Sequence, residues 1–440
     1  MSFTRRSFLK AATIAAASGV AIPQVVPSSV LGNGERAAAG ERIAVGCIGT
    51  GHRGNAVMGE FMGQKDVQIV ALCDVKAWAL KETKERVDKQ YGGNACATYS
   101  DFRKLLDRSD IDAVLVASTD HWHVLHSIAA ARARKDVYME KPMGLNMAEC
   151  IALRKAMEEN RRVFQFGTQQ RSDGKFRLAC ELALNEKIGK LRTINVWSPG
   201  SSAGGSPEPA PVPEGLDYDM WLGPSPFKPH TQNRCDNSLW WFISDYALGF
   251  IAGWGIHPID VAAWGAGEKL NSTVEVEGKG EFPKQGVADT AMNWRIKLKF
   301  ENGLVIDFAG DPRPEEWTKR YPQSESHGTA FEGSEGWVHV NRAALNSQPA
   351  SLVDAKIPEN GIHLYRSPGH VRNFLDCVKS RAKTICPIDE AVRSETLCQI
   401  SEIAIRLGRK VKWDWKTETF PDDEEANRKL KRAMRAPWTL

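Results

Sequence analysis

The fold of this chain is decided by the stretch IAVGCIGTGHRG, residues Ile43–Gly54. Its first half is a short apolar run, which predicts a buried strand, and a helix is expected at about 54–62. Between them, Gly49, Gly51 and Gly54 form the pattern G-x-G-x-x-G. In such a loop the first glycine makes a tight turn, the second lets the backbone approach a pyrophosphate, and the third lets helix and strand pack closely. The stretch therefore predicts a dinucleotide-binding loop, with a glycine turn that binds nothing as the alternative.

Apolar runs that alternate with helix-favouring segments extend this start to a whole domain. The runs are 67–73, 111–117, 137–139 and 163–166, and the helical segments are 76–90, 121–134 and 147–161. Strands that are apolar throughout and alternate with helices are typical of a parallel sheet covered on both faces. We therefore predict an α/β fold that begins with a doubly wound parallel sheet, a Rossmann domain, over residues 40–166.

Beyond Gly167 the pattern changes to that of a second domain. Helices are expected at 176–185, 247–265, 371–380 and 388–407, and strands at 191–197, 291–300, 304–309 and 337–341. Several of these strands alternate in polarity, as antiparallel strands do. The segment 198–230 holds eight of the 22 prolines, so we expect no regular structure there, but a functional loop or a disordered insert. The second domain is expected over 167–410, with a C-terminal strand and tail over 411–440.

The N-terminus has the features of an export signal. A twin-arginine pair, Arg5-Arg6, precedes an uncharged, alanine-rich stretch at 11–31, and Ala37-Ala38-Ala39 offers small residues for cleavage. The stretch is only mildly apolar and contains prolines, which suits a signal better than a membrane span. We predict a twin-arginine signal peptide over 1–39 and a periplasmic or secreted protein. A basic, disordered N-terminus on a cytoplasmic protein is the alternative.

Composition excludes several classes of protein. Hydrophobic residues make up 42% of the chain and charged residues 25%, which is average for a globular protein. The net charge is +4, and no basic block outside the leader suggests a nucleic-acid partner. We expect no membrane span in the mature protein. The nine cysteines include no C-x-x-C pair, and we expect Cys47 and Cys73 to be buried. The sequence contains no H-E-x-x-H motif, so we expect no catalytic metal site.

Polar side chains follow three of the predicted parallel strands. Asp74 ends the second strand, where a carboxylate can accept both adenosine ribose hydroxyls and repel a 2′-phosphate. This favours NAD over NADP. Arg53, in the glycine loop, keeps NADP open as the alternative cofactor. Asp120 ends the next strand and either caps the following helix or contacts the cofactor. Lys141, in Glu140-Lys141-Pro142, can polarise a hydroxyl beside the nicotinamide, or form a solvated salt bridge.

Together with later motifs, these residues resemble the Gfo/Idh/MocA oxidoreductase family. The motifs are, in order, the glycine loop, Asp74, residues 119–123, residues 140–144, and Gly253-Trp254-Gly255-Ile256-His257-Pro258-Ile259-Asp260. The resemblance covers about 40–410 and implies a Rossmann domain followed by a C-terminal α/β domain with a large open antiparallel sheet. It also implies NAD(P)-dependent hydride transfer at a hydroxyl of a sugar, glycoside or cyclitol, and a homo-dimer or homo-tetramer. Lys141 would contact nicotinamide and substrate, and His257 would be the acid/base residue.

One position departs from the family. Many of its sugar and inositol dehydrogenases carry an aspartate four residues before the histidine, where this chain has Gly253. Asp245 and Asp260 are the candidates to replace that carboxylate. The leader and the terminal Arg435-Ala436-Pro437-Trp438 resemble a secreted branch of the family.

We therefore expect the following site. The catalytic residues are Lys141 and His257. The cofactor-binding residues are Gly49, Gly51, His52, Arg53, Gly54, Asp74, Thr119, Asp120, His123, Glu140, Lys141 and Gln169. The substrate-binding residues are Arg171, Asp245, Trp254, His257 and Asp260, with Trp254 as a platform for a sugar face and an interdomain structural network as the alternative for Gln169 and Arg171. Two other functions stay open: an NAD-dependent glycoside hydrolase that works by transient oxidation, elimination, hydration and re-reduction, and a non-catalytic NAD-binding sensor.

Overall fold

The structure, a computed structural model, describes residues 36–93, 96–236, 239–322 and 325–440. The chain divides into two units, residues 1–42 and 43–440. In the first unit a short 3-10 helix, η1 (Ala39–Glu41), is described; the twin-arginine pair and most of the predicted signal peptide lie outside the described residues. The site and the fold that positions it belong to the second unit.

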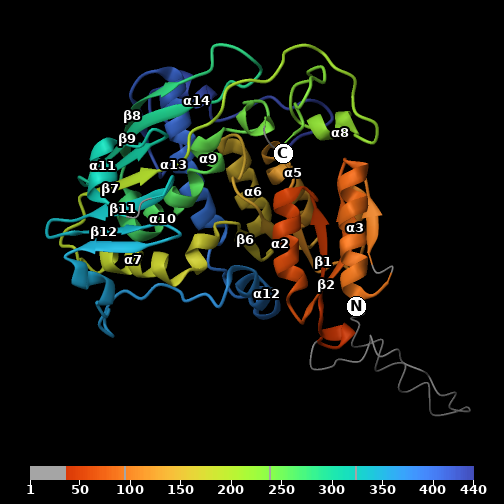
Figure 1. Ribbon diagram of the computed structural model, residues 1–440, viewed down its shortest axis with the longest axis horizontal. Coiled ribbons are helices and arrows are strands. Elements are labelled where there is room, and N and C mark those ends of the chain that lie inside the picture. Colours follow the sequence, from red (N-terminus) through yellow and green to blue (C-terminus); the bar gives the residue numbers. More distant parts are fainter. Residues whose placement is uncertain (1–35, 94–95, 237–238, 323–324) are drawn as a thin grey trace, which may run out of the picture. The chain divides into compact units, whose positions relative to one another are not determined.

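A six-stranded parallel sheet forms the first half of this unit (Figure 1). Its strand order is β3-β2-β1-β4-β5-β6. Strands β1 to β3 therefore extend the sheet in one direction, and β4 to β6 extend it in the other from β1. The strand order reverses between β1 and β4, and in open parallel sheets ligands bind at the carboxyl ends of the strands beside such a reversal. The predicted doubly wound sheet is confirmed. The strands are β1 (Ile43–Ile48), β2 (Val67–Cys73), β3 (Ala97–Tyr99), β4 (Ala113–Val116), β5 (Asp136–Met139) and β6 (Phe164–Phe166).

Helices cover both faces of the parallel sheet. Phe61 and Val87 pack in one apolar cluster, and Leu105, Ile128 and Leu153 pack in another. The predicted helices are confirmed, but the first begins at His52 rather than at Gly54 because Gly51, in an extended conformation, ends the loop there. The short β3 and α4 were not predicted. The helices are α2 (His52–Met62), α3 (Ala77–Tyr91), α4 (Phe102–Leu106), α5 (Asp120–Arg132) and α6 (Met147–Glu159).

The second half contains an eight-stranded sheet of order β13-β12-β11-β7-β10-β9-β8-β14. The predicted large antiparallel sheet is confirmed in its main part, but β10 pairs with β7 in parallel. Strands β8, β11 and β13 were not predicted. The strands are β7 (Thr193–Trp197), β8 (Val274–Glu281), β9 (Asn293–Phe300), β10 (Val305–Ala309), β11 (Gly328–Glu332), β12 (Trp337–Val340), β13 (Leu345–Gln348) and β14 (Val411–Trp413).

Two predictions about helices in this half are wrong. The single helix expected at 247–265 is divided, because the backbone N–H of Gly255 donates to the carbonyl of Phe250, five residues back, and so leaves the regular four-residue pattern. The proline-rich segment contains a short helix, whose first turn is capped by the carboxylate of Asp217. The helices are η2 (Gln169–Ser172), α7 (Gly174–Leu184), α8 (Tyr218–Leu222), η3 (Trp240–Phe242), α9 (Phe250–Gly253), α10 (Ile256–Ala266), η4 (Gly267–Asn271), α11 (Glu315–Arg320), η5 (Ala350–Asp354), α12 (His370–Ser380), α13 (Ile388–Leu407) and α14 (Glu424–Arg428).

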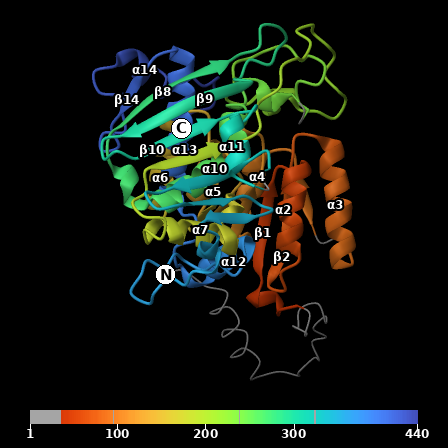
Figure 2. The same cartoon turned by 60° about the vertical axis from the view of Figure 1, so that its left-hand side comes forward.

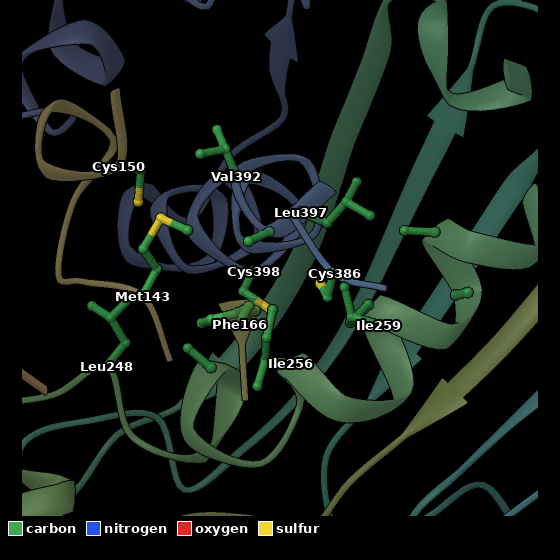
Figure 3. Packing of buried hydrophobic residues seen from close by; sticks show 14 of the residues in the cluster. Met143, Cys150, Phe166, Leu248, Ile256, Ile259, Cys386, Val392, Leu397 and Cys398 are labelled. Atoms are coloured by element: carbon green, nitrogen blue, oxygen red, sulfur yellow. The ribbon is translucent and has the colours of Figure 1, made fainter. Parts of the chain in front are cut away.

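One apolar core joins the two sheets. Helix α10 packs on β7 and β11 of the second sheet, and α13 packs on β8 and also reaches β6 of the first sheet. Figure 1 shows both helices between the two sheets, and in Figure 2 they overlap the second sheet. Phe166 of β6 packs beside Ile256 of α10 and Cys398 of α13 (Figure 3). In addition, Phe374 of α12 contacts Phe61 of α2, with ring centroids 6.0 Å apart, so a helix from the second half covers the first sheet. The two halves are therefore held together by packing, which fixes the walls of the site between them.

The remaining sequence features concern cysteines, metals and membranes. All nine cysteines are buried and unpaired, and Cys47 and Cys73 pack in the core as predicted. Among the described residues, no three His, Cys, Asp or Glu side chains gather to hold a metal ion. Within the same ranges, none of the helices has the length and apolar character needed to cross a bilayer.

Candidate functional site

A deep cleft lies at the carboxyl ends of the parallel strands. Its empty volume is about 1110 Å³, including the part open to solvent. All the residues predicted to bind the cofactor line it except Gly54 and Gln169. The structure thus brings together residues from four separate strand ends, namely Gly49, Gly51, His52, Arg53, Asp74, Thr119, Asp120, His123, Glu140 and Lys141.

The glycine loop fits a pyrophosphate. Gly49 has φ +93°, and a Cβ there would lie 2.4 Å from the carbonyl oxygen of Ala117. A Cβ on Gly54 would lie 2.2 Å from the carbonyl oxygen of Gly49, so both positions need glycine. At Gly51 no atom lies within 4 Å of that position, and the backbone is open to the cleft. The start of α2 therefore presents free N–H groups in a space that an anion can enter.

Asp74 is held rigidly at the end of β2. One carboxylate oxygen accepts hydrogen bonds from the backbone N–H of Thr50, at 2.7 Å, and from its hydroxyl, at 2.9 Å. The other accepts one from the N–H of Lys76, at 2.9 Å. These bonds orient the carboxylate on the wall of the cleft, where it can still accept the hydroxyls of a ribose.

Another wall of the cleft begins in the segment 198–230, which was predicted to be a functional loop or a disordered insert, and continues beyond it. The Trp122 indole donates to the carbonyl oxygen of Met220, at 3.0 Å, and a ring nitrogen of His121 lies 2.8 Å from the carbonyl oxygen of Trp221. These bonds attach α8 to α5. Six of the 14 tryptophans lie between Trp197 and Trp264, but the sequence did not show that some of them line this cleft. This wall contains Met220, Trp221, Cys235, Trp240 and Trp241.

Glu140 links three of the predicted motifs. Its carboxylate pairs with Arg53 of the glycine loop at 2.9 Å and accepts a hydrogen bond from the Gln169 amide at 3.1 Å. Gln169 thereby connects the start of the second half to the rim of the first. The Arg53 guanidinium therefore faces Glu140.

Lys141 points from the rim toward the second sheet. Its Nζ donates a hydrogen bond to the carbonyl oxygen of Gly253 at 2.7 Å. Burial lowers the pKa of Lys141, while the neighbouring carboxylates of Glu140 and Asp120 oppose that shift. The position at which the family aspartate is missing thus contacts the lysine directly, through its backbone.

Asp120 and His123 support this rim. Asp120 is the first residue of α5 rather than its N-cap, which is Thr119, and burial raises the pKa of its carboxyl while Lys141 opposes the change. His123 lies with its Nδ1 2.6 Å from the carbonyl oxygen of Pro142 and its Nε2 3.0 Å from that of Ser118. Burial lowers the pKa of His123 to about 4, so the ring is neutral near pH 7 and donates to one of these two carbonyls. His123 therefore connects two rim loops.

His257 lies at the start of α10, next to Lys141. It is 4% exposed, and its Nδ1 is buried without a hydrogen-bond partner among the described residues. The ring packs against Trp254, with centroids 5.6 Å apart. Burial, followed by the charges of Lys141 and Arg342, lowers the pKa of His257 well below its usual value. A neutral imidazole with a free nitrogen can accept a proton.

The other residues predicted to bind substrate have different partners. Arg171 and Asp260 form a buried two-point ion pair, with both N–O distances 2.8 Å, and the hydroxyl of Ser394 also donates to Asp260 at 2.6 Å. This arrangement favours the structural alternative for Arg171. Asp245 faces Arg432 of the C-terminal tail, 3.8 Å away. None of these contacts supplies the missing carboxylate to Lys141.

Two further residues complete the surroundings of His257. The Arg342 guanidinium, after β12, lies 4.9 Å from the centre of the Trp254 ring. The His327 ring, before β11, lies 5.0 Å from the same ring. No motif surrounds either residue in the sequence, so local patterns could not have identified them.

Comparison with known proteins gives matches over most of the chain. Residues 43–168 match a family model described as "Oxidoreductase family, NAD-binding Rossmann fold". Residues 196–440 match one described as "Oxidoreductase family, C-terminal alpha/beta domain".

Individual proteins are similar over parts of the chain or in fold. The chain is 29% identical to myo-inositol 2-dehydrogenase of Thermotoga maritima over 273 residues, which are 60% of this chain and 66% of that protein. It is 31% identical to a glycosyl hydrolase family 109 protein of Shewanella pealeana over 168 residues, which are 34% of this chain and 36% of that protein. The chain therefore spans less than two thirds of either relative. The WlbA dehydrogenase of Chromobacterium violaceum, solved with NADH and UDP-GlcNAcA, has the same fold, with a TM-score of 0.62 at 16% identity over 84% of this chain and 96% of that one.

Proposed function

The chain belongs to the Gfo/Idh/MocA oxidoreductase family, and on this premise we propose that it is an NAD-dependent enzyme that transfers hydride at a hydroxyl of a sugar, glycoside or cyclitol. The observation that carries the proposal is the position of Lys141 between the cofactor cleft and the Gly253–His257 segment. The names of the relatives, an inositol dehydrogenase and a sugar-nucleotide complex, support the substrate class.

The residues of this chain suit such a reaction. When bound, NAD supplies the hydride acceptor, the nicotinamide ring. Lys141 donates a hydrogen bond to the oxygen of the reacting hydroxyl, and His257 accepts its proton. The alcohol loses one hydride and one proton and becomes a ketone, and the reverse reduction returns both. The aromatic wall of α8 and η3 excludes water from the cleft during the transfer.

We also propose NAD rather than NADP as the cofactor. Asp74, fixed at the end of β2, would repel the 2′-phosphate of NADP. Arg53, the residue that left NADP open, is paired with Glu140. Asp74 and Arg53 therefore both support NAD as the cofactor.

Asp74→Ala should weaken NAD binding by about tenfold to a hundredfold, because the ribose loses hydrogen bonds to a charged acceptor. The discrimination against NADP should fall at the same time. Titration calorimetry of the cofactor-free protein with each nucleotide measures both. The control is Asp110→Ala, since Asp110 is a surface residue that pairs with Arg108. An unchanged dissociation constant for NAD in the Asp74 variant would contradict the assignment.

His257→Gln should lower kcat by about a hundredfold or more, because the variant lacks the proton acceptor. NAD binding should stay the same, because His257 does not line the cofactor cleft. The rate of NADH formation at saturating substrate measures the effect. His363→Gln, at an exposed histidine, is the control. If the two variants turn over at the same rate, His257 is not the base.

The NAD-dependent glycoside hydrolase remains the second candidate. The similarity to the family 109 glycosyl hydrolase supports it, and so does the predicted export, because free NAD is scarce outside the cytoplasm. Incubation of the NAD-loaded protein in heavy water with glycosides and free sugars, followed by mass spectrometry, separates the candidates. A keto-sugar with matching NAD reduction indicates the oxidoreductase. A cleaved glycoside with deuterium beside the oxidised carbon, without net reduction, indicates the hydrolase. Bound NAD without any turnover indicates the sensor.

Export and assembly complete the proposal. The Arg5-Arg6 leader supports transport through the twin-arginine pathway to the periplasm or the medium. Family membership supports a homo-dimer or homo-tetramer formed through the face of the second sheet. Light scattering of the purified protein measures the assembly.

A further inference from the structure

The Arg342 guanidinium has no charge partner in the part of the chain that the structure describes. It lies over Trp254, 4.9 Å from the ring centre, and no described residue forms a hydrogen bond or ion pair with its N–H groups. The charge of Glu325 attracts it, and that of Arg53 repels it. The side chain is accessible to solvent, so a ligand can reach its donors.

Arg342 is one of three cations near His257. Burial lowers the pKa of His257 most, and the charges of Lys141, Arg342 and Arg53 lower it further. The Glu140 carboxylate of the rim is bound to Arg53 and to the Gln169 amide. Arg53 is thus paired, and Lys141 lies near the carboxylates of Glu140 and Asp120. Within the described residues Arg342 has no ion pair, so its charge is the one that an anionic ligand can meet.

Two buried ring nitrogens beside Arg342 also lack hydrogen-bond partners within the described ranges. They are Nδ1 of His257, which is 4% exposed, and Nε2 of His327, whose side chain is 5% exposed. The nearest carboxylate oxygen to His327, from Glu325, is 3.5 Å away, which is too long for a good hydrogen bond. Buried polar atoms are normally paired, so these two indicate the place of a polar ligand.

We propose that the substrate is a sugar acid or its glycoside, whose carboxylate binds to the Arg342 guanidinium. Arg342 is a single uncompensated guanidinium, and its planar donors match one carboxylate at two points. Trp254 and His327 then flank the sugar ring, and His257 faces the reacting hydroxyl. This inference rests on the proposed function, because it names the substrate class of the same site.

An acidic substrate also suits the chemistry of His257. Lys141, Arg342 and Arg53 oppose protonation of the ring, which weakens it as a base. A carboxylate bound at Arg342 neutralises one of these charges and makes the ring a better proton acceptor when the substrate is present. Neutral sugars lack this effect.

The test compares matched acidic and neutral sugars on the full chain with NAD added. The probes are methyl β-D-glucuronide against methyl β-D-glucoside, D-galacturonate against D-galactose, and D-glucose 6-phosphate. Absorbance at the NADH band measures turnover, and saturation-transfer NMR measures binding. We expect the acidic member of a pair to have the higher kcat/KM, and Arg342→Gln to lower that value by about tenfold to a hundredfold, mainly through KM. The kcat/KM for the neutral member should change little in Arg342→Gln. Arg342→Lys should retain part of the kcat/KM for the acidic member that Arg342→Gln loses.

Arg320→Gln is the matched control. Like Arg342, Arg320 lies over a tryptophan ring, with its guanidinium 5.9 Å from the centre of the Trp337 ring. Unlike Arg342, it forms an ion pair, with Glu332. This variant should leave the preference for the acidic sugar unchanged.

The outcomes separate the inference from the function on which it rests. Three results would show that the inference is wrong while the oxidoreductase function stands. They are a higher kcat/KM for the neutral sugars, a preference for glucose 6-phosphate, and an equal loss of kcat/KM for acidic and neutral sugars in Arg342→Gln. If no probe reduces NAD but the uronates bind in an Arg342-dependent manner, the inference stands and the hydride-transfer function fails. If no uronate binds, the inference is overturned.

Discussion

Lys141→Met should lower kcat by about 10²- to 10⁴-fold, the contribution typical of a positioned acid or base. Methionine retains most of the length and apolar volume of the lysine stem but cannot donate a hydrogen bond. In the native chain Nζ is held at the carbonyl of Gly253, between the cofactor cleft and His257. The reacting oxygen therefore loses its polarising cation, while the cleft that holds NAD keeps its shape.

A comparison of kcat with the NAD dissociation constant tests this. In the Lys141 variant kcat should fall while the dissociation constant changes only by a small factor. Lys155→Met serves as the control, because the Lys155 side chain is 73% exposed and pairs with Glu159 at the surface. A Lys141 variant with nearly native kcat would remove Lys141 from the mechanism and weaken the proposed function as a whole.

Asp260→Asn should lower the free energy of unfolding by about 3–5 kcal/mol, because it leaves a buried charge without its partner. Arg171 and Asp260 are 2% and 0% exposed and contact each other at two points. The pair joins η2 to the first turns of α10, the helix that presents His257. Urea denaturation, followed by the fluorescence of the tryptophans, measures the change.

The same variant separates the two interpretations of Asp260. If Asp260 contacts substrate, as first expected, the variant should keep its stability and lose kcat/KM. If it is structural, stability should fall, and replacing both partners, as in Arg171→Leu with Asp260→Asn, should recover part of it. Asp376→Asn is the control, since Asp376 forms an exposed ion pair with Arg372 that is worth about 1 kcal/mol or less.

The cofactor half of the site could be predicted because its residues follow from local rules. Gly49 and Gly54 occupy positions where a Cβ would collide with backbone, and this requirement is visible as a motif. Asp74 directly follows β2, and Lys141 is the second residue after β5. Since parallel strands end at one edge of the sheet, an apolar run followed by a polar residue predicts a rim residue without knowledge of the tertiary contacts.

The substrate half could not be predicted in the same way. Lys141 contacts Gly253, which lies more than a hundred residues later in the chain. Arg342 lies over Trp254, about ninety residues before it. No local sequence pattern encodes contacts over such separations. Arg171 and Asp260 carried charges that suit a sugar, and only their burial against each other showed a different use. Likewise, a strand's own pattern does not state its partner, so the parallel pairing of β10 with β7 was missed.

The amino-acid sequence thus determined the parallel sheet, the glycine loop and the polar rim, because each depends on residues that are neighbours along the chain. Only the tertiary structure decided which wall closes the cleft, what holds Lys141 and which cation stands beside His257. Those features arise from packing between α10, α13 and the two sheets. Burial and charge at a given side chain are properties of that packing, and they exist only once the distant segments have met.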